Sequence, residues 1–379
     1  MESKVERKKV EFRFLSEPEM IKAGVLDVKK CVETMDDTFR LLGQGDFVMG
    51  GYNQSSHGCM LWYPKESPFP NMPLAGPDRR YMSMPAYIGG RYNCCGVKWY
   101  GSNVANPRER GLPRSILLAC LNDPVTGEPL AIMSANLLSA MRTGCVPGVA
   151  AKYLARDGAE SLGVIGCGVI SRACARGILT NMPKVKKLYL NDIKRSSAEN
   201  FAKEMAEEFD LEIIITDRLK DAVADSDVIS VAAAGPVPVV IDRDWLKPGC
   251  LFTATGHAEL SEVCWQENQV VFDYWPMHEV WYDEGKMHPD GIESTRDWAP
   301  SYQMFKMLEQ GKVRMQDMLS LSDIAVGKIN PRKSAEDKIL FISGGLPVED
   351  VSWGYVLYEE AVRQGLGVSL KLWDQAHWL

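Results

Sequence analysis

Residues 161–171 read Ser161-Leu162-Gly163-Val164-Ile165-Gly166-Cys167-Gly168-Val169-Ile170-Ser171. A short apolar run leads into a glycine-rich turn, and a helix-like segment follows. This order is typical of the strand, turn and helix that open a dinucleotide-binding unit, where glycines and a helix N-terminus approach a pyrophosphate. The sequence therefore predicts an α/β fold with a Rossmann-type, doubly wound nucleotide domain.

A second apolar run, residues 187–191, ends at Asp192. An acid at this point binds the ribose hydroxyls and repels a 2′-phosphate, which favours NAD. Lys194 and Arg195 follow it and could accept that phosphate, so NADP stays possible. An ordinary tight turn beside a surface acid is the alternative interpretation. The residues of this unit expected at the cofactor are Gly166, Gly168, Val169, Ile170, Ser171 and Asp192.

The composition is that of an ordinary globular protein. A chain of 379 residues with 46% hydrophobic and 25% charged residues is long enough for two domains. The net charge of −7 argues against nucleic acid as a partner. The sequence contains neither a long apolar span nor a secretory signal, so we expect a cytoplasmic protein that does not enter a membrane. The 10 cysteines lack zinc-site spacings, so we predict free thiols and no metal.

The pattern of apolar runs changes along the chain. Between residues 46 and 130, short runs separated by Pro, Gly and Asn predict a largely antiparallel sheet. After Asp192, strands alternate with helix-length segments, which predicts a parallel sheet. Residues 275–318 give no periodic signal, and residues 345–361 predict a helix that returns to the first domain.

Two basic residues, Lys98 and Arg142, lie in apolar sequence settings. A guanidinium can hold a carboxylate through two parallel hydrogen bonds, and a partly desolvated ammonium can bind charge or exchange protons. Together they suggest a pocket for an amino acid or keto acid. Alternatively, Lys98 extends to the surface and Arg142 pairs with a structural acid.

Several motifs make a family resemblance specific. They are Met84-Pro85-Ala86-Tyr87-Ile88-Gly89-Gly90, Gly96-Val97-Lys98-Trp99, Asn122-Asp123-Pro124-Val125-Thr126-Gly127, Met141-Arg142-Thr143, Gly166-Cys167-Gly168 and Gly345-Leu346-Pro347-Val348-Glu349-Asp350. In order and spacing the chain resembles the ornithine cyclodeaminase and mu-crystallin family from about Phe14 to Trp373.

The resemblance implies an α+β substrate and dimerisation domain formed by both chain ends, residues 1–155 and 336–379, around a NAD(P)-binding domain, residues 156–335. It implies a homodimer with an active site in the cleft between the domains. Lys98 and Arg142 would hold the substrate carboxylate, and Lys98 would assist proton transfer. Thr143 would contact the cofactor, and the helix around Asp350 would border the nicotinamide.

The chain departs from ornithine cyclodeaminases at two places. Residues 49–58 lack the additional carboxylate-binding arginine of those enzymes, and residues 255–260 lack their aspartate near the reacting amine. His257 could replace that aspartate as a general base because its unperturbed pKa, about 6.5, is near neutrality. Glu259 is the other candidate, and His257 could also be a hydrogen-bonded loop residue. His57 is a candidate for the substrate pocket.

The resemblance implies an amino-acid oxidoreductase, in the simplest case an ornithine cyclodeaminase. That enzyme converts L-ornithine to L-proline and ammonia through an imine, without net turnover of NAD. The departures leave a net amino-acid dehydrogenase, a ketimine reductase or an opine-type dehydrogenase as alternatives. A mu-crystallin-like binding protein is the alternative from a different functional class.

Overall fold

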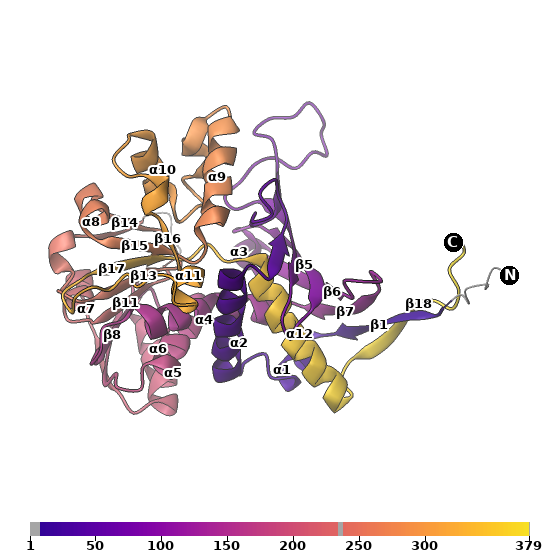
Figure 1. Cartoon of the computed structure of the whole chain (residues 1–379), viewed down its shortest axis with the longest axis horizontal. Coiled ribbons are helices and arrows are strands. Elements are labelled where there is room, and N and C mark those ends of the chain that lie inside the picture. The colour runs from indigo at the N-terminus through magenta and orange to yellow at the C-terminus, as the bar shows by residue number, and fades with distance from the viewer. Residues whose placement is uncertain (1–7, 234–237, 379) are drawn as a thin grey trace. The chain divides into compact units, whose positions relative to one another are not determined.

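The computed structural model describes residues 8–233 and 238–378 (Figure 1). They form two compact units. The first combines the described residues up to Asp27, Asp46–Ser139 and those from Pro347 onward, and the second combines Val28–Gly45 with Ala140–Leu346. Both chain ends thus share one unit. The units divide at other residues than the predicted boundaries at 155/156 and 335/336.

Helix packing explains the difference in boundaries. Helix α2 (Val28–Gln44) packs on α5 (Val169–Asn181) and α11 (Leu321–Ala325), so it joins the second unit. The long helix α4 (Asn136–Leu154) approaches α5 so closely that a Cβ at its Gly144 would overlap the backbone of α5. Boundaries placed from the sequence do not include such helix-to-helix contacts.

The first unit is built on an eight-stranded sheet in the order β18-β1-β7-β6-β5-β4-β2, with β3 paired to β4. The strands are β1 (Val10–Leu15), β2 (Phe47–Met49), β3 (Cys59–Trp62), β4 (Arg80–Ile88), β5 (Cys94–Ser102), β6 (Ser115–Asn122), β7 (Pro129–Ser134) and β18 (Val368–Trp373). Only β1 and β7 pair in parallel, so the sheet is largely antiparallel, as predicted. Helix α12 (Pro347–Gln364) returns to this unit and packs on β4, β5 and β6. The unit's short helices are α1 (Glu17–Lys22) and α3 (Asn106–Glu109).

The second unit contains the predicted parallel sheet, with eight strands in the order β10-β9-β8-β11-β13-β17-β15-β16. The strands are β8 (Ser161–Ile165), β9 (Lys187–Asn191), β10 (Glu212–Ile215), β11 (Val228–Val231), β13 (Leu251–Ala254), β15 (Gln269–Phe272), β16 (Leu319–Ser320) and β17 (Ile339–Ile342). Every residue of β8, β11, β13 and β17 is buried, which explains their continuous apolar runs. A small parallel pair, β12 (Val239–Ile241) and β14 (Ala258–Leu260), lies outside this sheet.

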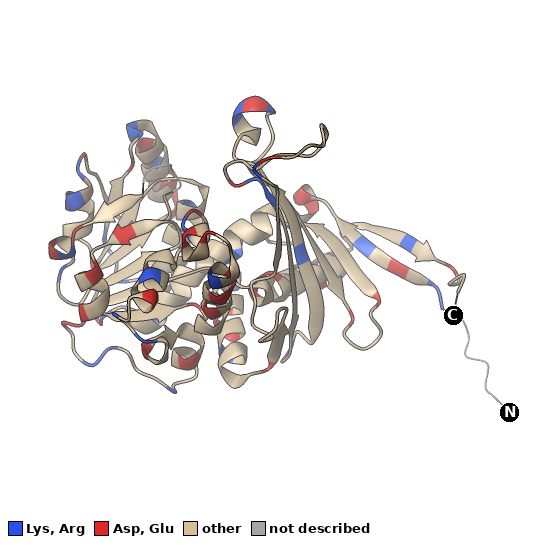
Figure 2. Ribbon diagram, turned by 90° about the horizontal axis from the view of Figure 1, so that it is seen from above, with Lys and Arg blue, Asp and Glu red and all other residues tan. Residues whose placement is uncertain are grey.

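Helices pack against the parallel sheet (Figure 1). They include α5, α6 (Arg195–Glu208), α7 (Leu219–Ala224) and α8 (Glu262–Glu267). Helices α9 (Trp275–Met287) and α10 (Tyr302–Glu309) occupy the stretch for which the sequence gave no periodic signal. Acidic and basic residues are interspersed over the described part of the chain (Figure 2).

All 10 cysteines are free thiols, and most are buried. Burial raises the pKa of Cys174 to about 12 and that of Cys250 to about 11, so these thiols stay protonated at neutral pH. Among the described residues, no group of His, Cys, Asp and Glu is arranged to hold a metal ion. The described part of the chain also contains no helix that is both long and apolar enough to span a bilayer.

Asp227 joins the ends of several elements at the base of the parallel sheet. Its buried carboxylate accepts hydrogen bonds from Arg156 Nη2 at 2.6 Å, the Glu160 amide at 2.9 Å and the Ser161 amide at 3.0 Å. It also lies 2.9 Å from Lys247 Nζ. Burial opposes ionisation, but these partners outweigh it and hold the pKa of Asp227 far below its usual range.

We expect Asp227→Asn to lower the free energy of unfolding by about 3 kcal/mol at pH 7, because it removes a buried carboxylate charge that pairs with two half-buried cations, Arg156 and Lys247. A carboxyl group whose pKa is depressed by folding stabilises the protein above its unfolded pKa of about 3.9, and the contribution declines as pH falls below that value. The difference in the free energy of unfolding between wild type and variant should therefore become smaller at acid pH. Urea unfolding at pH 7 and at acid pH measures it, and a difference independent of pH would contradict the assignment.

Candidate functional site

The glycine-rich turn after β8 leaves space in front of a helix N-terminus. Gly166 has a φ of +82°, and a Cβ there would lie 2.9 Å from Ala233, so the position requires glycine. Gly168 is the N-cap residue of α5, and a Cβ built on it would meet no atom within 4 Å. None of the described side chains caps this helix. The first-turn amides of α5 therefore face a space that suits a pyrophosphate.

Asp192 lies beside this turn, as expected for the acid at the end of the second strand of a dinucleotide-binding unit. Its Oδ2 accepts a hydrogen bond from the Cys167 amide at 2.7 Å, and its Oδ1 accepts one from the Lys194 amide at 2.7 Å. Each carboxylate oxygen can accept a further hydrogen bond, so the ribose hydroxyls of a dinucleotide fit here. Arg172 donates to the Cys167 carbonyl at 2.7 Å and holds the turn from the other side.

Arg195, one of the two nearby cations that could accept a 2′-phosphate, is engaged by acids. Arg195 Nη1 donates to Asp217 Oδ1 at 2.6 Å, and its Nε donates to Glu199 Oε1 at 3.2 Å. A 2′-phosphate would have to compete with two carboxylates for this guanidinium and would also face Asp192. These contacts favour NAD over NADP.

The other residues predicted at the cofactor differ in exposure. Val169 is 69% exposed and Ile193, next to Asp192, is fully exposed, so apolar surface flanks the turn. Ile170 and Thr143 are partly buried. Ser171 is completely buried, so its hydroxyl cannot reach a ligand in front of α5. Only the backbone amide of Ser171 can therefore contribute to the helix N-terminus.

Lys98 is buried on β5, with 2% of its surface exposed. Its Nζ lies 2.8 Å from Asp350 Oδ2 on α12 and donates to Ser139 Oγ at 3.2 Å. The ammonium also lies 5.6 Å from the centre of the Tyr100 ring. The alternative in which Lys98 extends to the surface is thus wrong. A charged lysine at this depth is stable because Asp350 supplies the opposite charge.

Arg142 is buried on α4, with 4% of its surface exposed, and belongs to the second unit. A Cβ built on Gly345 would overlap its guanidinium, and the three atoms nearest to that Cβ all belong to Arg142. Gly345 has a φ of +80°, a conformation that also favours glycine. The guanidinium therefore lies close against a glycine turn that precedes α12 in the chain, with Nη1 nearest to Gly345.

The candidate histidines lie in different settings. His57 is buried in the loop between β2 and β3 of the first unit. His257 and Glu259 are exposed near the start of β14 in the second unit. The segment that lacks the expected aspartate is thus partly a strand paired with β12. The role of His257 as a general base stays a prediction.

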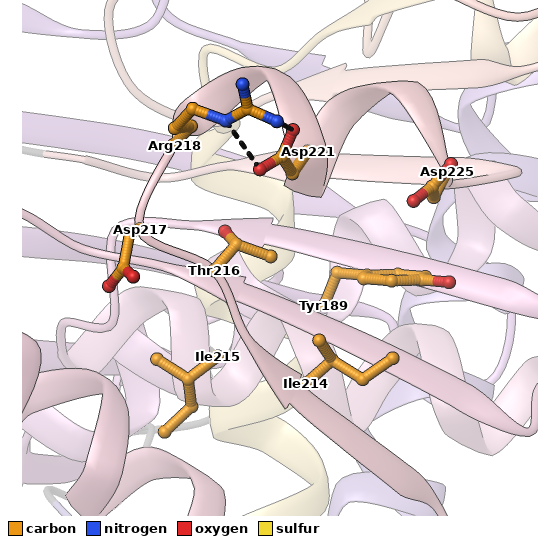
Figure 3. A pocket seen from close by; sticks show the side chains of 8 residues that line it. All are labelled: Tyr189, Ile214, Ile215, Thr216, Asp217, Arg218, Asp221 and Asp225. Carbon is orange, nitrogen blue, oxygen red and sulfur yellow. Dashed lines mark hydrogen bonds and ion pairs between the residues drawn. The ribbon is translucent and has the colours of Figure 1, made fainter.

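A cavity of about 460 Å³ lies at another place on the second unit, between β9, β10 and α7 (Figure 3). Its lining includes Tyr189, Thr216 and Arg218, and Arg218 Nη2 donates to Asp221 Oδ1 at 2.7 Å. It contains none of the residues predicted to bind substrate or cofactor.

Sequence reasoning missed the positioning contacts of three polar residues, Ser139, Asp273 and Asp350. Ser139 and Asp350 hold Lys98, and Asp273 binds the amides of the turn that precedes α12. The motif that ends at Asp350 indicated that its helix is functional. No local sequence pattern, however, predicts that Asp350 contacts Lys98. Asp273 follows an apolar strand, a position where polar residues often serve a site, and that signal could have identified it.

The chain is similar in sequence to a known family and to proteins of known activity. Residues 25–365 match the model of the ornithine cyclodeaminase/mu-crystallin family. The chain is 28% identical over 301 residues to N-((2S)-2-amino-2-carboxyethyl)-L-glutamate dehydrogenase of Staphylococcus aureus, covering 78% of this chain and 82% of that protein.

Two solved structures share the fold over nearly the whole chain. The Δ1-pyrroline-2-carboxylate reductase of Thermococcus litoralis, in complex with NADH and L-proline, has a TM-score of 0.75 at 24% identity and covers 95% of this chain and 100% of that one. An archaeal alanine dehydrogenase dimer with bound NAD has a TM-score of 0.75 at 22% identity and covers 96% of this chain and 100% of that one.

Proposed function

Because the chain belongs to the ornithine cyclodeaminase/mu-crystallin family, we propose that it is an NAD-dependent oxidoreductase acting on the Cα–N bond of an amino acid or of the corresponding imine. In one direction it is an amino-acid dehydrogenase, and in the other an imine reductase. The observation that carries the proposal is the burial of two cations, Lys98 and Arg142, in a chain that also has an open dinucleotide turn.

The turn between β8 and α5 would hold the dinucleotide. The α5 amides would bind its pyrophosphate and Asp192 its ribose, and the exposed Val169 and Ile193 would be covered by the adenosine. When bound, the nicotinamide accepts a hydride from Cα or returns one to the imine carbon.

Lys98 and Arg142 would orient the substrate. Ser139, which contacts Lys98, lies on α4, three residues before Arg142 in the sequence. Two cations would fix the substrate carboxylate and so direct Cα toward the cofactor. As the hydride leaves Cα, the nitrogen loses a proton, and Lys98 with its partner Asp350 can hold or return that proton. Water then releases ammonia and the keto acid from the imine.

Two observations favour net oxidation or reduction over cyclodeamination. The segment at residues 255–260 has no aspartate, and half of it is strand β14. Of the relatives named above, one is a dehydrogenase acting on an amino-acid derivative, and the two structural neighbours are a reductase and a dehydrogenase. Ornithine cyclodeamination remains the alternative outcome of the test.

A substrate panel tests the proposal. The purified protein is incubated with NAD or NADP and L-alanine or L-ornithine, or with NADH or NADPH and either pyruvate plus ammonia or Δ1-pyrroline-2-carboxylate. Nicotinamide absorbance and products are followed. Stoichiometric NADH formation or consumption supports a dehydrogenase or reductase. Proline and ammonia from L-ornithine without net NADH identify a cyclodeaminase instead. Tight cofactor binding without turnover of any substrate would favour a binding protein.

We also propose a homodimer formed through the sheet of the first unit. Its outer face carries half-exposed apolar side chains, including Leu61, Trp99 and Ile116, and Tyr81 stacks on Trp99. A monomer rarely leaves such a patch exposed. We expect sedimentation equilibrium at micromolar concentration to give twice the chain mass of 42.3 kDa, and a monomer would contradict the assignment.

A further inference from the structure

Asp273 lies immediately after β15 and is completely buried. Its Oδ2 accepts hydrogen bonds from the Gly344 amide at 2.6 Å and the Gly345 amide at 2.7 Å. Its Oδ1 accepts one from the Tyr274 amide at 2.8 Å. A carboxylate that binds two successive amides fixes the path of the backbone between them, because both N–H groups must point at one oxygen.

His278 and Ser301 form a chain of hydrogen bonds that holds the Asp273 carboxylate. His278 Nε2 lies 2.7 Å from Asp273 Oδ1, and His278 Nδ1 lies 3.0 Å from Ser301 Oγ. Since a carboxylate only accepts, Nε2 carries the hydrogen, and in a neutral ring Nδ1 accepts from the serine. All three side chains are fully buried. The order Ser–His–Asp is that of a hydrolase triad, but a serine closed off from solvent cannot attack a substrate, so the role is structural.

The turn held by Asp273 has Arg142 on one side and α9 on the other. A Cβ on Gly345 would overlap the Arg142 guanidinium, whereas a Cβ on Gly344 would lie 2.6 Å from Met277 and 2.8 Å from Trp281 of α9. The same helix carries His278. Two glycines thus let a backbone segment fill the narrow space between α9 and Arg142, and Asp273 fixes its position.

We propose that Asp273 is a positioning residue for Arg142. It holds the Gly344–Gly345 turn against the guanidinium, and His278 and Ser301 keep its carboxylate in place. This inference deepens the proposed function and rests on it only where the consequence for substrate is concerned. If Arg142 binds the substrate carboxylate, a loosened turn weakens that binding and leaves the dinucleotide turn after β8 untouched.

Arginine modification tests the positioning directly and needs no substrate. Phenylglyoxal reacts with accessible guanidinium groups, and mass spectrometry of peptides gives the rate at each arginine. We expect Arg142 to react slowly in the wild-type protein and several-fold faster in Asp273→Asn, where an amide group has to face backbone N–H donors or the His278 ring. Gly345→Ala, which overlaps Arg142 directly, should have the same effect.

The matched control is Asp227→Asn, which removes another buried carboxylate from the same sheet. It should accelerate labelling of Arg156, its own partner, and leave Arg142 unchanged, whereas Asp273→Asn should do the reverse. Thermal unfolding verifies that each variant is folded. Equal labelling of Arg142 in the wild type and in both Asp273→Asn and Gly345→Ala overturns the inference, as does equal acceleration by Asp227→Asn.

Kinetics separate this inference from the proposed function. With a substrate from the panel, Asp273→Asn should raise KM about 10–100-fold, as when a partner that orients a binding group is removed, with a smaller effect on kcat and an unchanged NADH affinity. Arg142→Gln is the reference. If it leaves KM unchanged, the assigned role of Arg142 fails while the labelling result stands. If only Arg142→Gln raises KM, the positioning role fails.

Discussion

Replacing Lys98 with methionine should reduce kcat/KM by about 1,000-fold. A charge-assisted hydrogen bond to a substrate carboxylate contributes about 1.5–3 kcal/mol, and positioned proton transfer contributes about 100–10,000-fold. Methionine keeps the length and apolar stem of lysine but has no charge. Steady-state kinetics with the substrate from the panel measure the loss, and NADH affinity should be unchanged.

The buried partner of Lys98 supplies the control. Lys98→Met leaves the Asp350 carboxylate, only 1% exposed, without its cation, which should cost about 3–5 kcal/mol of stability. The double variant Lys98→Met/Asp350→Leu removes both charges and should recover most of that stability without recovering activity. Activity that returns together with stability would show that Lys98 acts only in folding.

Gly168→Asp should have opposite effects on stability and on cofactor binding. Aspartate is among the best N-cap residues and complements the helix dipole, and a Cβ at this position meets no atom, so α5 should be as stable as before or more so. NADH binding should weaken by about 100-fold or more, because like charges 4 Å apart repel by about 4 kcal/mol near a protein surface. Calorimetric titration with NADH measures the affinity.

Gly168→Asn separates charge from size. Asparagine caps helices about as well as aspartate and has nearly the same shape, so it should preserve stability and weaken NADH binding less. Raising the salt concentration should reduce the difference in NADH affinity between Gly168→Asp and Gly168→Asn, because salt screens the added charge. Unchanged NADH affinity in Gly168→Asp would exclude the N-terminus of α5 as the pyrophosphate site.

The elements predicted correctly from sequence are those with strong local patterns. The glycine turn, the buried strands around it and the antiparallel strands can each be recognised within a single segment. Apolar residues recur in them at a regular spacing or in short runs bounded by Gly, Pro or Asn. Strand β18 has no such pattern, because all of its residues are exposed. Helix α9 was missed because residues around most of its circumference, including His278, are buried, so it lacks an amphipathic pattern.

The site was predictable only as separate parts. Lys98 and Arg142 stood out as cations in apolar stretches of sequence, and both are buried; their role toward a substrate stays a prediction. Their partners come from distant sequence: Asp350 lies far along the chain from Lys98, and Asp273 reaches the turn beside Arg142 only because β15 and β17 are neighbours. Such pairings depend on strand order, which no single segment of sequence encodes.

The two strands that flank β1 are synthesised at very different times. β1 lies between β7 and β18, and Phe14 pairs with Val368. At about 5–20 residues per second, a ribosome needs roughly 20–70 s to make the chain between these two residues. Throughout that time one edge of the nascent β1 has no neighbour, and an unpaired edge invites aggregation. β18 pairs with this edge of β1, so removal of β18 would leave the edge open in every finished molecule.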